Sequence, residues 1–322
     1  MSAQGAVVGG LGLFITVAIC TLNRAESLRR TLGSLAAMQV PSDLTWEIII
    51  VNNNSTDHTD DVIGQYRDQL PVRREFEPRR GHSNARNRAI DAARGEYIVW
   101  TDDDVVVRPD WLSAYAAAFR RWPEAAVFGG RIIPRYEEPA VKWIVDSEAI
   151  VRGAYAIRDL GNEMQPLSIT EDRIPYGANF AILTKEQRAF RYDPNLGLAP
   201  NRRRYYDEVD VITRLLDSGA RGYWIPEAIV DHCIGQEKQT ICYITEYYIA
   251  VGETEALRTA AASLPTRCWF GVPWHLWPQL CKRYLRYHFH RLVSPAPIWV
   301  KHLQAYATAR GTLQYWRQQK QL

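Results

Sequence analysis

Three consecutive aspartates, Asp102, Asp103 and Asp104, are the residues of this sequence whose types and spacing point most directly to chemistry. They follow residues 97–100, a short apolar run of β-favouring side chains that predicts a buried strand. Because side chains alternate along a strand, we expect Asp102 and Asp104 on one face and Asp103 on the other. Two carboxylates so close need a proton or a cation, and a hard divalent ion with oxygen ligands would satisfy both. The alternative is a solvated acidic turn before a helix that starts near Pro109.

A second acidic group, Asp207, Glu208 and Asp210, begins a predicted helix that ends near Gly219. Acidic side chains are favoured in the first turn of a helix by its dipole, and Asp210 lies four residues before Arg214. A structural explanation of this group therefore stays open beside a catalytic one.

The elements that must position these residues alternate between strand and helix. Apolar patterns predict strands over residues 14–20, 46–51, 72–76, 97–101 and 126–130, separated by helices over residues 26–38, up to about 69, 83–93 and 111–121. This alternation predicts an α/β fold, a mainly parallel sheet with helices on both faces, whose ligands collect beyond the carboxyl ends of the strands.

Residues 131–172 break the alternation, with prolines and no firm period, and a long irregular insert of this kind is typical of a lid or binding loop. Beyond it the sequence predicts strands over residues 177–183, 222–225 and 229–232, and then a helix over residues 236–262.

Length and composition indicate an ordinary soluble chain, with 322 residues of which 47% are hydrophobic. The five cysteines are widely spaced and form no CxxC pair, which argues against a disulfide framework or a zinc site and fits a reducing cytosol. Residues 5–22 carry no charge, but four glycines and the absence of a basic n-region predict a buried first strand here and argue against a membrane span or signal peptide.

The net charge of +3 conceals an asymmetry along the chain. After Glu255 there are ten Lys or Arg and no Asp or Glu, which leaves 29 basic and 36 acidic residues before it, a body of about −7 and a tail of +10. In residues 265–322 these cations are interleaved with large aromatic side chains, as in helices that lie in the headgroup region of a membrane. We expect an anionic membrane surface as the partner of this tail. Packing of its aromatics on the acidic body is the alternative.

The order of motifs resembles that of the family 2 glycosyltransferases, inverting enzymes with the GT-A fold that use nucleotide-sugar donors. The resemblance covers about residues 14–233, and seven motifs in the family's order make it specific. They are Thr21-Leu22-Asn23-Arg24, the loop at 52–57, residues 81–88 with Ala85-Arg86-Asn87, the Asp-X-Asp segment at 95–104, Gly177-Ala178-Asn179, Asp207-Glu208 and His232.

The resemblance implies a Rossmann-like GT-A domain over residues 1–235, with a nucleotide-sugar half at about 14–130 and an acceptor half at about 131–235. Residues 236–322 would form a separate helical region, rich in basic and aromatic side chains.

The resemblance also assigns roles to single residues. A divalent cation, Mn²⁺ or Mg²⁺, would be held by Asp104 with Asp102 and His232, while Gly177 and Asn179 would lie on the acceptor side. The nucleotide-sugar side would be formed by Thr21, Asn23, Arg24, Asn53, Arg86, Asp102 and Asp103.

A general base is needed because an acceptor hydroxyl is a poor nucleophile until its proton is removed. By the family's second position in the acidic pair, Glu208 is the first choice and Asp207 the second. The sequence departs from the family in two places: the acidic pair is reversed, and Asn53 stands where the family has an aspartate that reads the nucleotide base. An amide both accepts and donates, so the identity of the base is left open.

The sequence thus predicts an inverting hexosyltransferase that moves a sugar to a glycan or lipid-linked acceptor in cell-surface or extracellular polysaccharide synthesis. It would be cytoplasmic and peripheral on the inner face of the cell membrane. A catalytically degenerate GT-A module is the alternative, kept open by the asparagines at 52–54. A sugar-nucleotide pyrophosphorylase is disfavoured because the turn at 21–24 lacks glycine, and nucleic-acid binding because the body holds no recognisable reading module.

Overall fold

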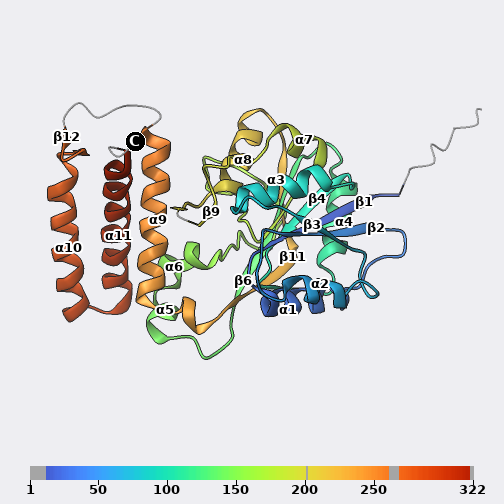
Figure 1. Cartoon of the computed structure of the whole chain (residues 1–322), viewed down its shortest axis with the longest axis horizontal. Helices are drawn as coiled ribbons and strands as arrows, with labels where there is room; N and C mark the ends of the chain where they lie inside the picture. Colours follow the sequence, from blue (N-terminus) through green and yellow to red (C-terminus); the bar gives the residue numbers. More distant parts are fainter. Residues whose placement is uncertain (1–11, 201, 261–267, 320–322) are drawn as a thin grey trace, which may run out of the picture.

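The structure is a computed structural model that describes residues 12–200, 202–260 and 268–319. A nine-stranded sheet forms the centre of the body, in the order β3-β2-β1-β4-β8-β6-β11-β5 with β7 paired to β11 (Figure 1). Its strands are β1 Phe14–Thr21, β2 Thr45–Asn52, β3 Val72–Phe76, β4 Tyr97–Thr101, β5 Val105–Val107, β6 Val127–Tyr136, β7 Gln165–Pro166, β8 Asn179–Leu183 and β11 Gly222–Ile234.

The sheet is mixed but mostly parallel, which confirms the predicted fold class. Strands β3, β2, β1 and β4 are parallel neighbours, and so are β6 and β11. Strand β8 runs antiparallel to both β4 and β6, and β5 is antiparallel to β11. The carboxyl ends of β1, β2 and β4 therefore share one edge, where the predicted motifs follow.

Residues 222–225 and 229–232, predicted as two strands, belong to the single strand β11. Its pairing with β6 shifts register between Ile225 and Ile229. Pro226 lies within this shift and has no N–H to donate, so the ladder is interrupted without ending the strand.

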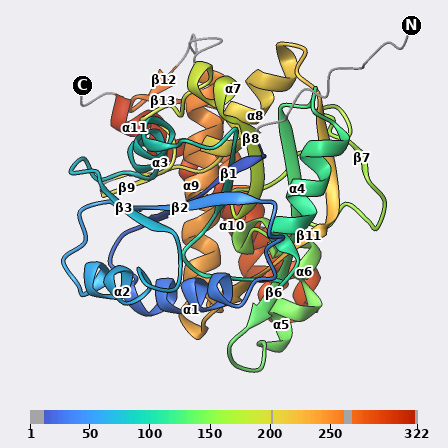
Figure 2. The ribbon, with the colours of Figure 1, turned by 90° about the vertical axis from the view of Figure 1, so that its right-hand side faces the viewer.

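Helices cover both faces of the sheet (Figure 2). On one face lie α1 Ala25–Ala36, α2 Thr59–Gln65 and α4 Trp111–Arg121, and on the other lie α3 His82–Ala92, α7 Thr184–Ala189 and α8 Asp207–Asp217. The alternation of β1 supplies both cores: Ile15 and Val17 pack in the cluster with Leu28 of α1, whereas Ala18 packs in the cluster with Ala85 of α3.

The insert at residues 131–172 is more ordered than predicted. Strand β6 continues to Tyr136, and α5 Lys142–Asp146, α6 Glu148–Val151 and the 3₁₀ helix η1 Arg152–Tyr155 follow. Val151 and Tyr155 are buried in one cluster with Ile244 and Leu303 from the C-terminal helices, so the insert joins the sheet to that region.

Three long helices form the C-terminal region, with α11 between α9 and α10 (Figure 1). The elements after β11 are η2 Gln236–Lys238, α9 Ile241–Ala260, β12 Cys268–Trp269, β13 Val272–Pro273, α10 Leu276–Val293 and α11 Ala296–Gln319. The helix predicted over 236–262 is thus the short η2 followed by α9, and positions 261 and 262 lie outside the described residues. Among the helices that the structure describes, none combines the length and apolarity needed to cross a bilayer. Two short strands, β9 Leu198–Ala199 and β10 Arg202–Arg203, form a separate pair before α8.

Candidate active site

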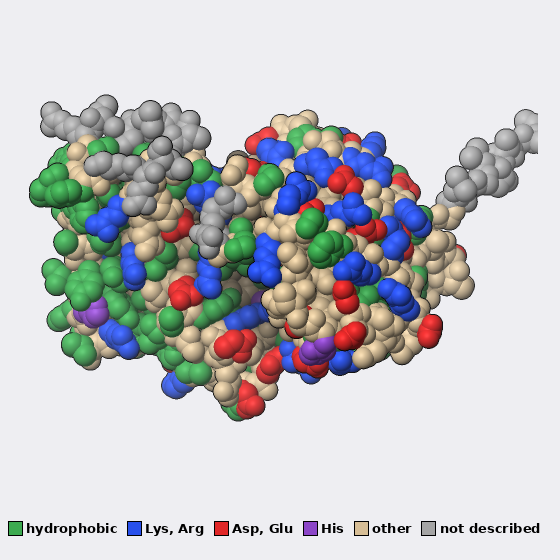
Figure 3. Space-filling view, viewed as in Figure 1, with side chains coloured by type: hydrophobic (Ala, Val, Ile, Leu, Met, Phe, Trp, Pro, Cys, Tyr) green, Lys and Arg blue, Asp and Glu red, His purple; other side chains and the backbone are tan. Residues whose placement is uncertain are grey.

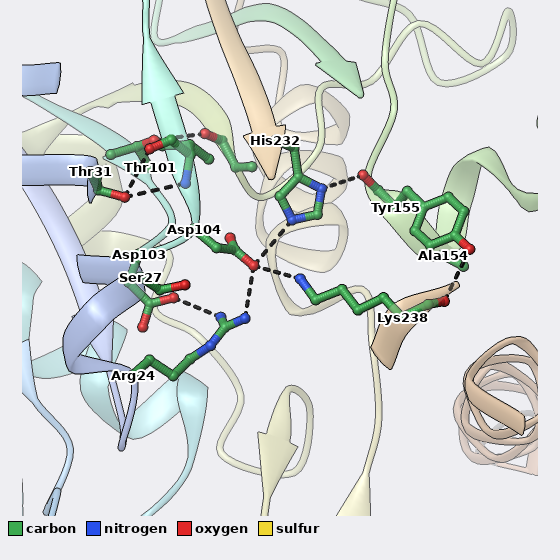
Figure 4. Close-up of polar contacts among 12 residues, drawn as sticks. Arg24, Ser27, Thr31, Thr101, Asp103, Asp104, Ala154, Tyr155, His232 and Lys238 are labelled. Atoms are coloured by element: carbon green, nitrogen blue, oxygen red, sulfur yellow. Dashed lines mark hydrogen bonds and ion pairs between the residues drawn. The ribbon is translucent and has the colours of Figure 1, made fainter. Parts of the chain in front are cut away.

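The three aspartates lie in the turn between β4 and β5, because β4 ends at Thr101. The strand alternation expected for them therefore does not apply, and the predicted pairing of Asp102 with Asp104 on one face is wrong. Asp103 and Asp104 share one cation instead: Arg24 donates from Nη1 to Asp103 Oδ1 at 2.7 Å and from Nη2 to Asp104 Oδ2 at 2.9 Å (Figure 4).

Asp104 is the centre of a buried group of charges. Its Oδ2 also accepts from Lys238 Nζ at 2.6 Å and lies 3.2 Å from His232 Nε2. The histidine is brought there by the sheet, since His232 pairs with Val105 where β11 runs antiparallel to β5. Burial alone would raise the pKa of Asp104, but the three nitrogen groups around it outweigh burial and hold that pKa well below its usual range.

The tautomer of His232 follows from its other ring nitrogen. Nδ1 lies 2.6 Å from the carbonyl oxygen of Tyr155, and a carbonyl only accepts, so Nδ1 carries the hydrogen. That leaves Nε2 facing the carboxylate of Asp104. Histidines that bind metals are oriented in the same way, by a hydrogen bond from their other ring nitrogen to a carbonyl or carboxylate. The contact of Nε2 with Asp104 is in itself also that of an ion pair.

The donor set fits a divalent cation at Asp104 and His232, and two of the three predicted ligands are therefore together. Asp102 is not with them. Among residues 12–200, 202–260 and 268–319, no group of three or more His, Cys, Asp or Glu side chains is placed to hold a metal ion. Diphosphate oxygens or water would have to complete the coordination.

The acidic pair at the start of α8 forms a second charged group. Asp207 Oδ2 accepts from Arg86 Nη1 at 3.1 Å and lies 3.4 Å from His82 Nδ1. Glu208 Oε1 accepts from the backbone N–H of Gly177 at 3.1 Å. A Cβ at residue 177 would lie 2.9 Å from Arg86 Nη2, so glycine lets that loop approach the charged pair closely.

Arg86 is almost completely buried and contacts the acidic pair from the protein interior. Its guanidinium lies 5.1 to 5.7 Å from the ring centroids of Trp100, Phe180 and Tyr192. Arg86 lines the cavity beside the acidic pair and donates to Asp207, so it positions that pair, and its predicted place on the nucleotide-sugar side stays a prediction.

The surroundings of Asp207 and Glu208 shift the pKa values of these adjacent carboxylates in opposite directions. Burial would raise the pKa of Asp207, but Arg86 and His82 outweigh it and hold that pKa well below its usual range. Burial, and then the neighbouring charge of Asp207, raise the pKa of Glu208 to about 7. A carboxylate with a pKa near neutrality is suited to accept and release a proton, and it stands beside one that stays ionised.

A cavity of about 200 Å³ opens over Glu208. Asp102 lines it, and Tyr176, Tyr206 and Tyr247 supply aromatic walls. Tyr247 comes from α9, so the site includes part of the C-terminal region. Gly153 and Ala154 of η1 line the same cavity, and the next residue, Tyr155, holds His232, so η1 lies between the two charged groups.

Two residues predicted for the site are instead fully engaged within the chain. Asn53 donates to the carbonyls of Glu77 and Arg79 and accepts from the N–H of Gly81, which fixes the loop before α3. Asn179, completely buried, donates to the carbonyls of Arg131 and Ala228.

The carbonyl oxygen of that Asn179 side chain accepts from Trp111 Nε1 and the Tyr115 hydroxyl, each at 2.8 Å. Asn179 therefore joins β8 to β6, β11 and α4 in the core. Asn23 ties two loops together, because its Oδ1 accepts from the N–H of Thr56 at 2.7 Å, and Thr21 is buried at the end of β1.

Several residues of the site carry no prediction from the sequence, among them His82, Lys238 and Tyr247. His82 lies within the motif at 81–88, and that motif is the signal that points to it. Lys238 and Tyr247 carry no local signal, because they reach the site only through the packing of η2 and α9 against the body.

The chain has a mostly parallel α/β sheet in which the Asp-X-Asp turn meets a histidine from β11, and an acidic pair lies at a cavity nearby. These are the features of a GT-A glycosyltransferase. The chain belongs to glycosyl transferase family 2, whose sequence model matches residues 16–182. The predicted family, fold and enzyme class are therefore confirmed.

The most informative relatives come from polysaccharide and lipid-linked glycan synthesis. The chain is 25% identical over 247 residues to the succinoglycan biosynthesis protein ExoM of Rhizobium meliloti (strain 1021), covering 75% of this chain and 74% of ExoM. It is also 25% identical over 228 residues to the glucosyl-dolichyl phosphate glucuronosyltransferase of Haloferax volcanii, covering 68% of each.

Solved structures with the same fold cover nearly the whole chain. The crystal structure of S. aureus TarS 1-349 has a TM-score of 0.55 and 16% identity, covering 96% of this chain and 91% of TarS 1-349. The mannosyltransferase PcManGT from Pyrobaculum calidifontis, in complex with GDP-Man and Mn²⁺, has a TM-score of 0.57 and 17% identity, covering 92% and 86%.

Proposed function

We propose that this protein transfers a sugar with inversion from a nucleotide-sugar donor to a hydroxyl of a glycan or lipid-linked acceptor. The carrying observation is Glu208 at the cavity wall, with a pKa raised to about 7 beside the ionised Asp207. Membership of the family and the names of ExoM and the Haloferax relative support polysaccharide or lipid-linked glycan synthesis as the setting.

The proposed reaction is a single displacement. The acceptor oxygen attacks the anomeric carbon as the bond from that carbon to the diphosphate oxygen breaks, the acceptor proton passes to Glu208, and the nucleoside diphosphate leaves. The N–H of Gly177 orients the Glu208 carboxylate, and Arg86 keeps Asp207 ionised. Burial, and then the negative charge of Asp207, raise the pKa of Glu208 and make it basic enough to take the proton.

We propose that Asp104 and His232 hold a divalent cation, Mn²⁺ or Mg²⁺, which when bound would stabilise the charge developing on the leaving diphosphate. Asp102 and Asp103 belong to the nucleotide-sugar side of the site, as do Arg24 and the loops tied by Asn23. The Mn²⁺ and GDP-Man named for PcManGT support this choice of cofactor and donor class.

Donor binding tests the proposal directly. UDP-, GDP- and dTDP-sugars are added with Mn²⁺, and thermal stability and release of the nucleoside diphosphate are measured. At least one donor should raise the melting temperature and be turned over slowly. If no donor shifts the melting temperature, the degenerate-module alternative gains the advantage.

We further propose that residues 265–322 hold the enzyme at the inner face of the cell membrane. The described aromatics of this region divide into two sets. Tyr287, Trp299, Tyr306 and Tyr315 pack within the protein, whereas α10 and the segment before it expose apolar side chains. The exposed set is Trp269, Phe270, Trp274, Tyr284, Leu285, Phe289, Leu292 and Val293.

This exposed set gathers at the outer edge formed by α10, at the left of Figure 3. Leu285, Phe289 and Leu292 are 66%, 61% and 85% exposed and follow one another at helical spacing. The exposed cations Lys282 and Arg286 lie on the same helix. An apolar stripe beside cations, in a region without acidic residues, suits an anionic bilayer surface.

A further inference from the structure

We propose that Lys238 competes with the divalent cation for Asp104, so that the ammonium group occupies the site until a metal ion displaces it. This inference rests on the proposed role of Asp104 and His232 as metal ligands.

The ammonium group of Lys238 lies directly at the proposed metal site. Lys238 Nζ lies 2.6 Å from Asp104 Oδ2, the same oxygen that faces His232 Nε2 (Figure 4). The side chain of Lys238 is only 13% exposed and that of Asp104 only 5%. The ammonium therefore sits beside the two atoms that would hold a cation, in a place with little water to screen it.

Two hydrogen bonds hold the backbone of Lys238 in place. Its N–H donates to the carbonyl of Gly235 at 3.2 Å, and its own carbonyl accepts from the Tyr155 hydroxyl at 3.1 Å. Its four-carbon side chain can rotate about several bonds without disturbing this backbone. Release of the ammonium is therefore a side-chain movement alone.

The ammonium group and a divalent ion cannot both lie at Asp104. Within a few ångströms of one buried carboxylate, the two cations repel each other strongly. Arg24 differs from Lys238 because Asp103 holds the other arm of its guanidinium at 2.7 Å. Lys238 is thus the cation that gives way when a metal ion arrives, while Arg24 keeps the turn in place.

Metal affinity tests the proposal without any measurement of activity. Mn²⁺ binding to the full chain is measured by titration calorimetry, and by electron paramagnetic resonance of free Mn²⁺, with and without UDP or GDP. Lys238→Gln should tighten Mn²⁺ binding by roughly tenfold or more, since a competing charge is removed at contact distance. Lys142→Gln is the matched control, because it removes an exposed lysine paired with Asp146 on α5 and should leave the affinity unchanged.

A measurement on the natural chain guards against a variant that folds poorly. Brief acylation with an amine-reactive reagent, read by peptide mass spectrometry, should label Lys238 several-fold faster with Mn²⁺ present, while labelling of Lys142 stays the same. Equal or weaker Mn²⁺ binding by Lys238→Gln overturns the competition, and so does labelling of Lys238 that Mn²⁺ leaves unchanged.

Asp104→Asn separates this inference from the proposed function. If the natural chain binds Mn²⁺, Asp104→Asn does not, and Lys238→Gln binds like the natural chain, only the competition is refuted. If neither the natural chain nor Lys238→Gln binds Mn²⁺ with or without nucleotide, the metal site falls and the competition falls with it.

Discussion

Asp207 and Glu208 are neighbours with nearly the same chemistry, yet their surroundings give them opposite properties. Arg86 lies nearer to Asp207, at 3.1 Å, than to Glu208, at 3.7 Å, and His82 contacts Asp207, whereas Glu208 receives one backbone N–H and faces the cavity. Asp207 therefore stays ionised at neutral pH, whereas the pKa of Glu208 is about 7. Their partners from α3, and not their order along the chain, set the two carboxylates apart and support the proposal that Glu208 is the base.

The rate of transfer should fall as pH drops below about 7, because protonated Glu208 cannot accept the acceptor proton. Asp207→Asn removes the adjacent negative charge, so the pKa of Glu208 should fall and the acid limb should move to lower pH. A pH profile of kcat for both proteins measures this. An acid limb that stays in place or moves upward contradicts the assigned roles.

Stability should show the same pKa with a definite sign. The pKa of Glu208 rises from 4.5 to about 7 on folding, so folding is favoured by the protonated form and the contribution is lost as pH rises through 7. Glu208→Gln should therefore be more stable than the natural chain at pH 8, by about 1 to 3 kcal/mol, and equal to it near pH 4. Chemical denaturation at the two pH values tests this, with the exposed Glu163→Gln as control. If Glu208→Gln were less stable than the natural chain at pH 8, the raised pKa of Glu208 would be contradicted.

Residue types in the sequence were enough to nominate most of this site, but not to say which partners each side chain would find. Asn53 illustrates the limit. Its Nδ2 donates to two carbonyl oxygens, and a carboxylate oxygen in that place would be repelled by both, although an aspartate could still accept from the N–H of Gly81. The departure from the family's pattern therefore fits the hydrogen bonds of this loop. Asn179, which the resemblance puts on the acceptor side, makes four hydrogen bonds in the core.

The helices and strands with a strong hydrophobic period could be predicted from the sequence, whereas the connections between them could not. The period of β1, β2, β4, α1, α3 and α4 is plain in the sequence because each buries one face or both. Strand β5, only three residues long, has no such signal, yet its antiparallel pairing with β11 is what brings His232 to Asp104. The fold class was therefore accessible from the sequence, while the placement of His232 beside Asp104 depended on this short strand.

The contact between α9 and α11 depends on two glycines. A Cβ on Gly252 would lie 2.0 Å from the carbonyl oxygen of Thr308, and a Cβ on Gly311 would lie 1.9 Å from that of Ile249. Backbone cannot yield as a flexible side chain can, so the helices would have to separate.

Gly252→Ala should therefore destabilise the protein by about 1 to 3 kcal/mol, the usual cost of overpacking. Gly64→Ala is the matched control: it lies in α2, its added methyl meets no atom within 4 Å, and it should stabilise by up to about 1 kcal/mol. Urea denaturation of both variants gives the comparison. Equal or higher stability of Gly252→Ala would show that the two helices do not cross so closely.

At the scale of the whole molecule, the charge asymmetry of the sequence becomes a spatial one. The basic region folds as α10 and α11, and α11 packs against α9, α5 and α6, while α10 lies outermost. Removing residues 264–322 would take away Val300 and Leu303 and so expose Ile144, Ile244 and Tyr248, which are buried in one cluster with them, so truncation does not isolate a membrane effect. Substitution on the outer face of α10 does.

The double variant Leu285→Glu with Phe289→Glu should reduce binding to anionic vesicles by tenfold or more, since each apolar side chain contributes about 1.5 to 3 kcal/mol when buried in lipid. Ile169→Glu, at an exposed apolar residue of the body, is the control and should bind like the natural chain. Co-sedimentation with vesicles of varied anionic lipid content and salt measures both. Binding that is unaffected by the double variant, or by salt and anionic lipid, would refute a membrane role for α10.

The central claim is that Glu208 removes the acceptor proton in a nucleotide-sugar transferase. The measurement that tests it most directly is a paired determination of donor affinity and sugar transfer for the natural chain and Glu208→Gln, with the donor found by thermal shift and Mn²⁺ present. We expect Glu208→Gln to keep the donor dissociation constant of the natural chain and to transfer sugar about 10²-fold or more slowly, the usual scale for loss of a general base. Transfer by Glu208→Gln at the natural rate, or loss of donor binding in step with loss of transfer, would contradict it.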